Sequence, residues 1–193
     1  MKFIGVIYAT REGHTAKVAA RIAAGLHAQG FRAGLFDVKE EGPAIDLKLC
    51  DAVVIAASVH VGKHEPEIVK FVQQHVSRLE LIPSAFISVT LSEAGVERPS
   101  ATPEEHARFA ADVEGVIERF LKETGWHPKR IKPVAGAILY TKYNFFVRFV
   151  MKQIAKKAGG DTDTSRDYDY TDWASLDDFV KELAAEFERG VPA

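Results

Sequence analysis

Short apolar runs alternate with amphipathic helical patterns along almost the whole chain, and this alternation limits the fold more than any other feature. It is typical of right-handed strand–helix–strand units, which build an α/β fold with a parallel sheet covered by helices on both faces. The pattern predicts strands over residues 3–8, 32–38, 52–57, 85–89 and 134–140. It predicts helices over residues 14–29, 66–78, 103–124, 143–157 and 175–189, and a long loop over residues 92–103. We expect one domain, residues 1–193, because a chain of this length with 47% hydrophobic content can fill a single core.

The first predicted strand runs directly into the first predicted helix through a turn with the features of an anion site. The residues concerned are Thr10, Arg11, Glu12, Gly13, His14 and Thr15. The first N–H groups of a helix lack intrahelical partners and lie at the positive end of the helix dipole, so they can hold a phosphate group. The spacing is that of neither a P-loop nor a G-x-G-x-x-G turn, but it resembles the T-x-x-G-x-T loop that binds the FMN phosphate in flavodoxin-like proteins. The alternative is a plain turn with Thr10 as N-cap.

Two more loops are expected beside this turn if the five strands follow the doubly wound order 2-1-3-4-5. In such a sheet ligands bind beyond the carboxyl ends of the strands, where the strand order reverses. The loop after the third strand contains Ser58, Val59, His60, Val61, Gly62 and Lys63, and the one after the fourth contains Ser88, Val89, Thr90 and Leu91. Their backbone groups and apolar side chains would border a flat ring. The alternative is that both are plain surface connections, with His60 and His64 solvated. No catalytic base can be assigned, and His60 and Lys63 are candidates by position alone.

The composition excludes several classes of protein. The formal net charge is −2, yet residues 124–160 contain eight basic residues and no acidic one, so the rest of the chain is acidic. The single cysteine, Cys50, excludes an internal disulfide and a cysteine-based metal cluster, and we expect it to be a small apolar residue before the third strand. Sequence patterns of hydrolases and zinc enzymes are absent, and we expect no metal site. No signal peptide pattern and no apolar run of roughly 20 residues is present, which favours a cytoplasmic protein.

The predicted helix over residues 143–157 combines a basic stripe with an apolar arc. The stripe consists of Arg148, Lys152 and Lys156. The arc consists of Tyr143, Phe146, Val147, Val150, Met151 and Ile154, and we expect it to pack against the sheet. Phe145 and Phe149 fall among the cations, and aromatic residues on a basic face suit a membrane interface or an amphipathic ligand. A merely solvated face is the alternative, and nucleic acid is a weaker one because no recognition motif is present.

Two motifs near the C-terminal end make the reading more specific. They are Gly-Gly-Asp-Thr-Asp-Thr at 159–164 and Tyr-Thr-Asp-Trp at 170–173. Together with the loop at 10–15, Ala57-Ser58 with Gly62, Pro-Ser-Ala-Phe at 83–86 and Ala-Gly-Ala at 135–137, they resemble the flavodoxin-type, quinone-dependent protoporphyrinogen IX dehydrogenases of bacteria. The resemblance covers essentially the whole chain.

This resemblance implies FMN as cofactor, protoporphyrinogen IX as substrate, menaquinone or ubiquinone as acceptor, and a role in haem biosynthesis. It also implies peripheral association with the cytoplasmic face of the membrane, and it makes residues 141–158 the family's insertion after or within the fifth strand. A homo-oligomer stays open. The alternatives are a flavodoxin-like electron carrier, against which the basic helix argues, and an NAD(P)H:quinone reductase, for which the sequence shows no nicotinamide site.

Overall fold

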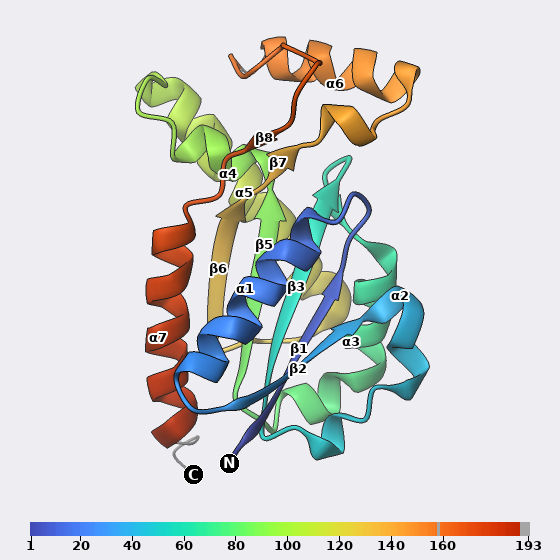
Figure 1. Ribbon diagram of the computed structural model, residues 1–193, viewed down its shortest axis with the longest axis vertical. Coiled ribbons are helices and arrows are strands. Elements are labelled where there is room, and N and C mark those ends of the chain that lie inside the picture. The colour runs from blue at the N-terminus through green and yellow to red at the C-terminus, as the bar shows by residue number, and fades with distance from the viewer. Residues whose placement is uncertain (158, 190–193) are drawn as a thin grey trace.

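Five parallel strands form the central sheet in the order β2-β1-β3-β5-β6, which confirms the predicted doubly wound order (Figure 1). The computed structural model describes residues 1–157 and 159–189. Residue 158 of the predicted insertion and residues 190–193 of the predicted domain lie outside the described residues. The strands are β1 (Phe3–Ala9), β2 (Arg32–Asp37), β3 (Ala52–His60), β5 (Ser84–Thr90) and β6 (Arg130–Ala135), and the short β4 (Lys63–His64) pairs antiparallel with β3.

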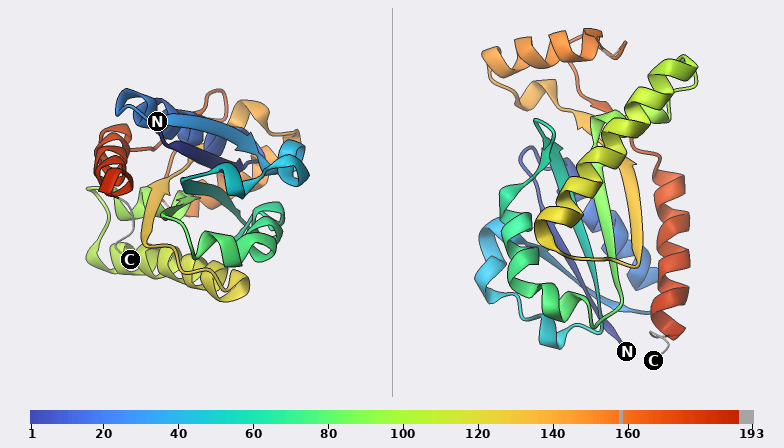
Figure 2. Two further views of the ribbon diagram at one scale, coloured as in Figure 1. Left: turned by 90° about the horizontal axis from the view of Figure 1, so that it is seen from below. Right: turned by 180° about the vertical axis from the view of Figure 1, so that it is seen from behind.

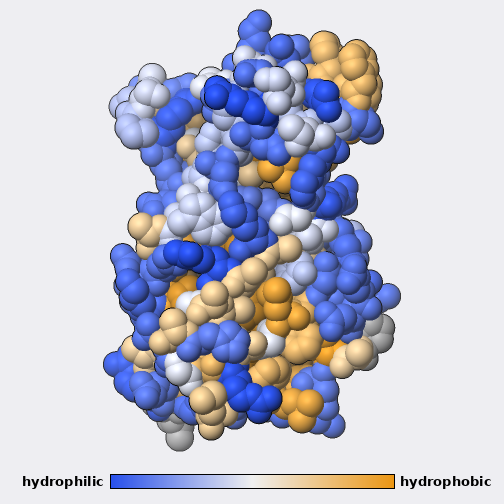
Figure 3. Space-filling view, in the orientation of Figure 1, coloured by the Kyte–Doolittle hydropathy of each residue, from blue (hydrophilic) through white to orange (hydrophobic). Residues whose placement is uncertain are grey.

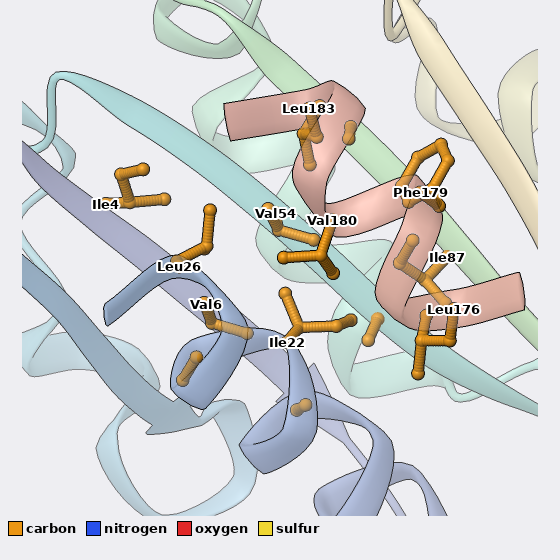
Figure 4. Close-up of a cluster of buried hydrophobic side chains, with 14 of the residues drawn as sticks. Ile4, Val6, Ile22, Leu26, Val54, Ile87, Leu176, Phe179, Val180 and Leu183 are labelled. Carbon is orange, nitrogen blue, oxygen red and sulfur yellow. The ribbon is translucent and has the colours of Figure 1, made fainter. Parts of the chain in front are cut away.

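Helices cover both faces of the sheet (Figure 2). Helices α1 (His14–Ala28) and α7 (Trp173–Arg189) lie on one face, and α3 (Pro66–Leu79) and α5 (Pro103–Thr124) lie on the other. Successive side chains of a strand point to opposite faces, so each strand feeds both cores. Figure 4 shows Val54 and Ile87 of the sheet packed with Ile22 of α1 and Leu176 of α7, all fully buried. The smaller helical elements are α2 (Val38–Glu41), α4 (Leu91–Val96), η1 (Gly42–Ala44), η2 (Leu47–Leu49) and η3 (Tyr140–Lys142).

The fifth predicted strand has the wrong bounds. Strand β6 begins four residues earlier, at Arg130, and ends at Ala135. The next residues form β7 (Ala137–Ile138), which leaves the main sheet and pairs with β8 (Tyr168–Asp169). Gly136 joins the two sheets: its N–H donates a 3.0 Å hydrogen bond to the Thr90 carbonyl at the end of β5, and its own carbonyl accepts one from the Tyr170 N–H at 3.2 Å. The early start was missed because β6 is an edge strand whose first residues are charged rather than apolar.

The long loop predicted over residues 92–103 is partly wrong as well. Its first part is helix α4, which begins after Thr90, and the Thr90 hydroxyl accepts a hydrogen bond from the Ser92 backbone N–H at 3.3 Å. Cys50 is buried in the core directly before β3, as predicted.

The predicted basic helix is α6 (Phe145–Lys157), but its apolar arc does not pack against the sheet. Figures 1 and 2 show α6 beyond the carboxyl ends of the strands, held away from them by the chain around η3 and β7. A cluster of tyrosines lies between α6 and the rest of the fold. The buried Tyr140 donates a hydrogen bond to the Asp161 carbonyl at 2.8 Å, and Tyr170 donates one to the Asp161 carboxylate at 2.9 Å. The Gly-Gly-Asp motif therefore anchors the insertion.

Among the described residues, none of the helices is both long enough and apolar enough to cross a membrane.

Candidate functional site

The turn between β1 and α1 has the backbone geometry of an anion-binding loop. Gly13 adopts φ 92°, the left-handed region, and is the N-cap of α1. None of the described side chains caps this helix, so the N–H groups of its first turn keep their capacity for a ligand. The alternative with Thr10 as N-cap is wrong. Its hydroxyl instead accepts a hydrogen bond from the Gly13 N–H at 3.0 Å, which closes the loop on itself.

Two lysines from distant segments fix this loop from outside. The Lys142 ammonium, in η3, donates to the Glu12 carbonyl at 2.6 Å, and the Lys39 ammonium donates to the Thr10 carbonyl at 2.7 Å. Each bond holds a backbone oxygen and brings a positive charge to the edge of the loop. Both charges would favour an anion there. Neither lysine was predicted from the sequence, because nothing in their local pattern separates them from ordinary surface lysines.

The Tyr-Thr-Asp-Trp motif supports the loop from inside. The Thr171 hydroxyl donates to the Ala135 carbonyl at 2.7 Å and lies 2.9 Å from His14 Nε2. Since that hydroxyl has only one proton, His14 Nε2 must donate to it. Burial lowers the pKa of His14 below its ordinary value. Next to it, Asp169 forms a 2.6 Å ion pair with Lys17 of α1. The motif therefore fixes the first turn of α1 to the end of the sheet.

The loop predicted after the third strand is a tight hairpin. Strand β3 extends to His60, turns at Val61 and Gly62, and returns as β4. Both turn residues have positive φ, 49° and 71°, as a two-residue type I′ hairpin requires. A β-branched residue in this region is strained, yet the Val61 side chain is fully exposed. Arg119 of α5 donates to the Gly62 carbonyl and holds the turn in place.

A buried carboxylate organises the polar side of the site. The Glu65 side chain is fully buried and receives the Arg11 guanidinium at 3.1 Å, while His60 Nε2 lies 3.3 Å from both Glu65 and Glu12. Burial alone would raise the pKa of Glu12, but the hydrogen bond and charge of His60 lower it below its ordinary value. The Ser58 hydroxyl adds a 3.3 Å bond to Glu65. Sequence reasoning missed Glu65, although its place two residues after the predicted loop was a usable signal.

These segments enclose a cavity of about 610 Å³ beyond the carboxyl ends of β1, β3 and β5. The predicted residues that line it are Thr10, Arg11, Glu12, His14, Thr15, Ser58, Val59, His60, Val61, Gly62, Val89, Thr90 and Leu91. The six residues of the predicted apolar arc, from Tyr143 to Ile154, also line it, together with Gly136 and Ala137. The arc therefore covers this cavity instead of the sheet.

Three predicted residues lie outside the cavity wall. Gly13 contributes only through the loop backbone, and the Lys63 side chain is exposed on strand β4. Ser88 is fully buried, with its hydroxyl 2.9 Å from His64 Nε2. His64 is buried between Phe86 and Phe120, so the alternative in which it is solvated is wrong. Burial lowers the pKa of His64 to about 4.

The outer face of α6 carries exposed aromatic residues, and Figure 3 shows an apolar patch over one end of this helix. Phe145 is 87% exposed and Phe149 is 57% exposed. Lys152 and Lys156 are exposed beside them. Arg148 departs from the expected stripe, because its guanidinium donates 3.0 Å hydrogen bonds to backbone carbonyls of the segment before the helix.

The arrangement fits a flat ring that carries a phosphate. The loop at 10–15 offers backbone donors and positive φ at Gly13, where a Cβ would oppose the backbone conformation. The hairpin on one side and residues 89–91 on the other leave a largely apolar space between them. Such a cradle is typical of flavin-binding α/β proteins.

A flavodoxin domain model matches residues 5–165, so sequence, fold and cavity define a flavoprotein of the flavodoxin class. The chain is 34% identical over 180 residues to Protoporphyrinogen IX dehydrogenase [quinone] of Escherichia coli (strain K12), with 93% of each chain covered. It is 33% identical to the protein of that name from Leishmania major, over 93% of this chain and 74% of the relative. The chain belongs to the family of quinone-dependent protoporphyrinogen IX dehydrogenases, which are oxidoreductases.

Solved structures agree on the fold. Rubredoxin oxygen:oxidoreductase of Desulfovibrio gigas matches with a TM-score of 0.54 at 12% identity, over 98% of this chain and 37% of that one. The oxidised flavodoxin 1 of Bacillus cereus matches with a TM-score of 0.52 at 15% identity, over 95% of this chain and 98% of that one. Similarity at this level of identity supports the flavodoxin-like fold alone.

Proposed function

We propose that this protein oxidises protoporphyrinogen IX to protoporphyrin IX in haem biosynthesis, with FMN as cofactor and a membrane quinone as electron acceptor. The observation that carries the proposal is the cavity of about 610 Å³, which joins an anion-ready loop to the apolar face of α6. The names of the relatives, which specify this substrate and a quinone, support it.

FMN is the flavin that this loop suits, because its single phosphate matches one helix N-terminus. Thr10 and Thr15 would add hydroxyl groups to the backbone donors of α1, and the charges of Lys142 and Lys39 would complement the phosphate. The ring would lie between the hairpin at Val61 and residues 89–91. When bound, a flavin supplies reversible two-electron oxidation and reduction.

The side chains of this protein would orient the substrate and exclude water. The apolar arc of α6 offers a macrocycle an uncharged surface above the cavity. His60 supplies an imidazole ring at the cavity wall. Ionised carboxylates only accept hydrogen bonds, so Nε2 of His60 carries the proton that faces Glu12 and Glu65. Each pair of electrons and protons removed from the porphyrinogen would convert one quinone to its hydroquinone.

The proposed reaction predicts a clear preference for quinone. Under anaerobic conditions the FMN-loaded protein should oxidise protoporphyrinogen IX with a menaquinone analogue. This rate should exceed the rate with oxygen alone by about tenfold, which equals about 1.4 kcal/mol in activation free energy. The measurement is the growth of porphyrin fluorescence, with boiled protein and free FMN as controls. A protein that holds FMN, ignores the porphyrinogen and reduces quinone with NADPH would be a reductase instead. One that only exchanges single electrons with a protein partner would be a carrier.

We also propose that the outer face of α6 contacts the membrane surface where the quinone resides. Exposed Phe145 and Phe149 beside Lys152 and Lys156 combine an apolar contact with positive charge. Each basic side chain near an anionic bilayer is worth roughly 1 kcal/mol. Arg148 is left out of this surface because its guanidinium bonds to its own backbone.

Replacing Lys152 and Lys156 by Gln should therefore weaken binding to phosphatidylserine vesicles, measured by sedimentation at low salt, by roughly 30-fold. Replacing Phe145 and Phe149 by Ser should weaken it at high salt too, because the apolar contribution is not screened. The matched control replaces Lys48 and Lys70, exposed lysines outside the insertion, by Gln. If the control loses as much binding as the first variant, only net charge matters and α6 is not the contact surface.

A further inference from the structure

A second cavity lies next to the first, between α4 and the inner side of α6. Its volume is about 660 Å³, and it is enclosed by α4, the start of α5, the inner side of α6 and the segment from Gly159 to β8. Leu91, Ala94, Phe109, Ile138, Met151 and Ile154 provide apolar walls. Gly95 brings α4 close to α5, because a Cβ there would meet the Phe109 ring at 2.4 Å. Nothing in the function proposed above uses this cavity.

The charges around the second cavity are mostly negative. Its lining includes four carboxylates, those of Glu97, Asp161, Asp169 and Asp172, and one guanidinium, that of Arg98. Arg98 lies 3.4 Å from Glu105, outside the lining, so its charge is partly balanced there, and Asp169 is likewise balanced by Lys17 at 2.6 Å. The negative charge of the lining therefore comes mainly from Glu97, Asp161 and Asp172. An anionic ligand would meet net repulsion at this lining, whereas a neutral apolar ligand would not.

The two cavities share a wall. Leu91, Met151 and Ile154 line both of them. Ile154 is half exposed, and methionine is an unbranched, adaptable side chain that packs against irregular ligands. An elongated ligand could therefore extend from one cavity into the other between α4 and α6.

We propose that the second cavity binds the isoprenoid tail of the quinone acceptor, whose head extends past the shared residues into the first cavity. This inference rests on the proposed function. A quinone with its tail is neutral and elongated: the tail suits the apolar walls, and its lack of charge avoids the repulsion that the carboxylates would exert on an anion. Protoporphyrinogen carries two propionates, which the same lining would repel. The porphyrinogen is therefore expected on the side of the phosphate loop, under the apolar arc of α6.

Ala94 offers a direct test, because its side chain lines the second cavity and not the first. In the FMN-loaded protein, Ala94→Phe should raise the Kd of a menaquinone with a short isoprenoid tail about tenfold or more, as measured by calorimetry. Its KM in the porphyrinogen assay should rise likewise. The values for menadione, which has no tail, and the KM for porphyrinogen should stay unchanged. The control is Ala110→Phe, an exposed position on α5 next to Phe109. Ala94→Leu repeats the comparison if the larger side chain prevents folding.

Each other outcome overturns the inference. Equal effects on both quinones, or none on either, would mean that the tail does not occupy this cavity. If Ala94→Phe raises the KM for porphyrinogen and leaves the values for both quinones unchanged, the porphyrinogen occupies this cavity. The same conclusion follows if that KM rises and the parent protein binds both quinones with equal affinity. Failure of the proposed function is a separate result. It would show as an absence of porphyrinogen oxidation with either quinone, while calorimetry would still report whether the tail binds.

Discussion

Gly13→Ala is expected to weaken FMN binding by roughly 10- to 100-fold, a loss of about 1.4 to 2.7 kcal/mol. Gly13 has φ 92°, which alanine adopts only at a cost of about 1 to 2 kcal/mol. The loop would relax away from this conformation and lose backbone donors for the phosphate, each worth about 1.5 to 3 kcal/mol to a charged group. The added Cβ itself would meet only Lys142 Nζ, at 3.4 Å, which is the mobile end of a side chain. The measurement is a titration of the apoprotein by flavin fluorescence.

Gly30→Ala is the matched control, because Gly30 follows the other end of α1 with nearly the same φ, 86°. Apart from Gly30 itself and its two neighbours in the chain, no heavy atom of the described residues lies within 4 Å of a Cβ at this position. Gly30→Ala should therefore lower the free energy of unfolding about as much as Gly13→Ala does and leave the Kd for FMN unchanged. Equal FMN affinity in all three proteins would show that the loop at 10–15 does not hold the phosphate.

The fold followed from sequence wherever a pattern had one structural meaning. Continuous apolar runs identify β1, β3 and β5 because strands buried on both faces need them, and the helical periods identify α1, α3, α5 and α7. The edge strand β6 was misplaced because its charged first residues face α7, where Arg130 pairs with Glu182. The end of β6 was misplaced because only Gly136 marks the point where the chain leaves the main sheet. A single glycine within an apolar run does not indicate that the strand ends there.

Only those parts of the site that follow from a local pattern or from the strand order could be predicted. The three loops at the carboxyl ends of the strands were located because strand order alone brings them together. The residues of the apolar arc of α6 were identified correctly, but the arc lines the cavity and does not pack on the sheet as predicted. An amphipathic pattern does not specify what its apolar face contacts. The contacts of Lys142 with Glu12 and of Thr171 with His14 join residues more than 100 positions apart. No local pattern encodes such contacts.

The stability of this protein should fall by about 3 kcal/mol between pH 6.5 and pH 4 through His64 alone. Burial lowers its pKa in the folded protein from 6.5 to about 4, and one pKa unit corresponds to about 1.4 kcal/mol. Because the folded pKa lies below the unfolded one, the unfolded chain takes up the proton first as the pH falls. The contribution is complete above pH 6.5, declines through the window, and is fully lost below pH 4. Urea unfolding at fixed FMN concentration across this range measures it.

His64→Gln should remove this part of the pH dependence, since glutamine can keep a hydrogen bond to Ser88 but does not titrate. The variant should be less stable than the parent at pH 7, because the contacts of the ring with Phe86 and Phe120 are lost. The difference between the two proteins should narrow as the pH falls. His127, whose side chain is 80% exposed, supplies the control, and His127→Gln should keep the parent's curve. If the His64→Gln variant loses stability with acid as steeply as the parent, His64 does not cause the pH dependence. The folded protein would then accept a proton on His64 without penalty, despite the burial of the ring against Phe86.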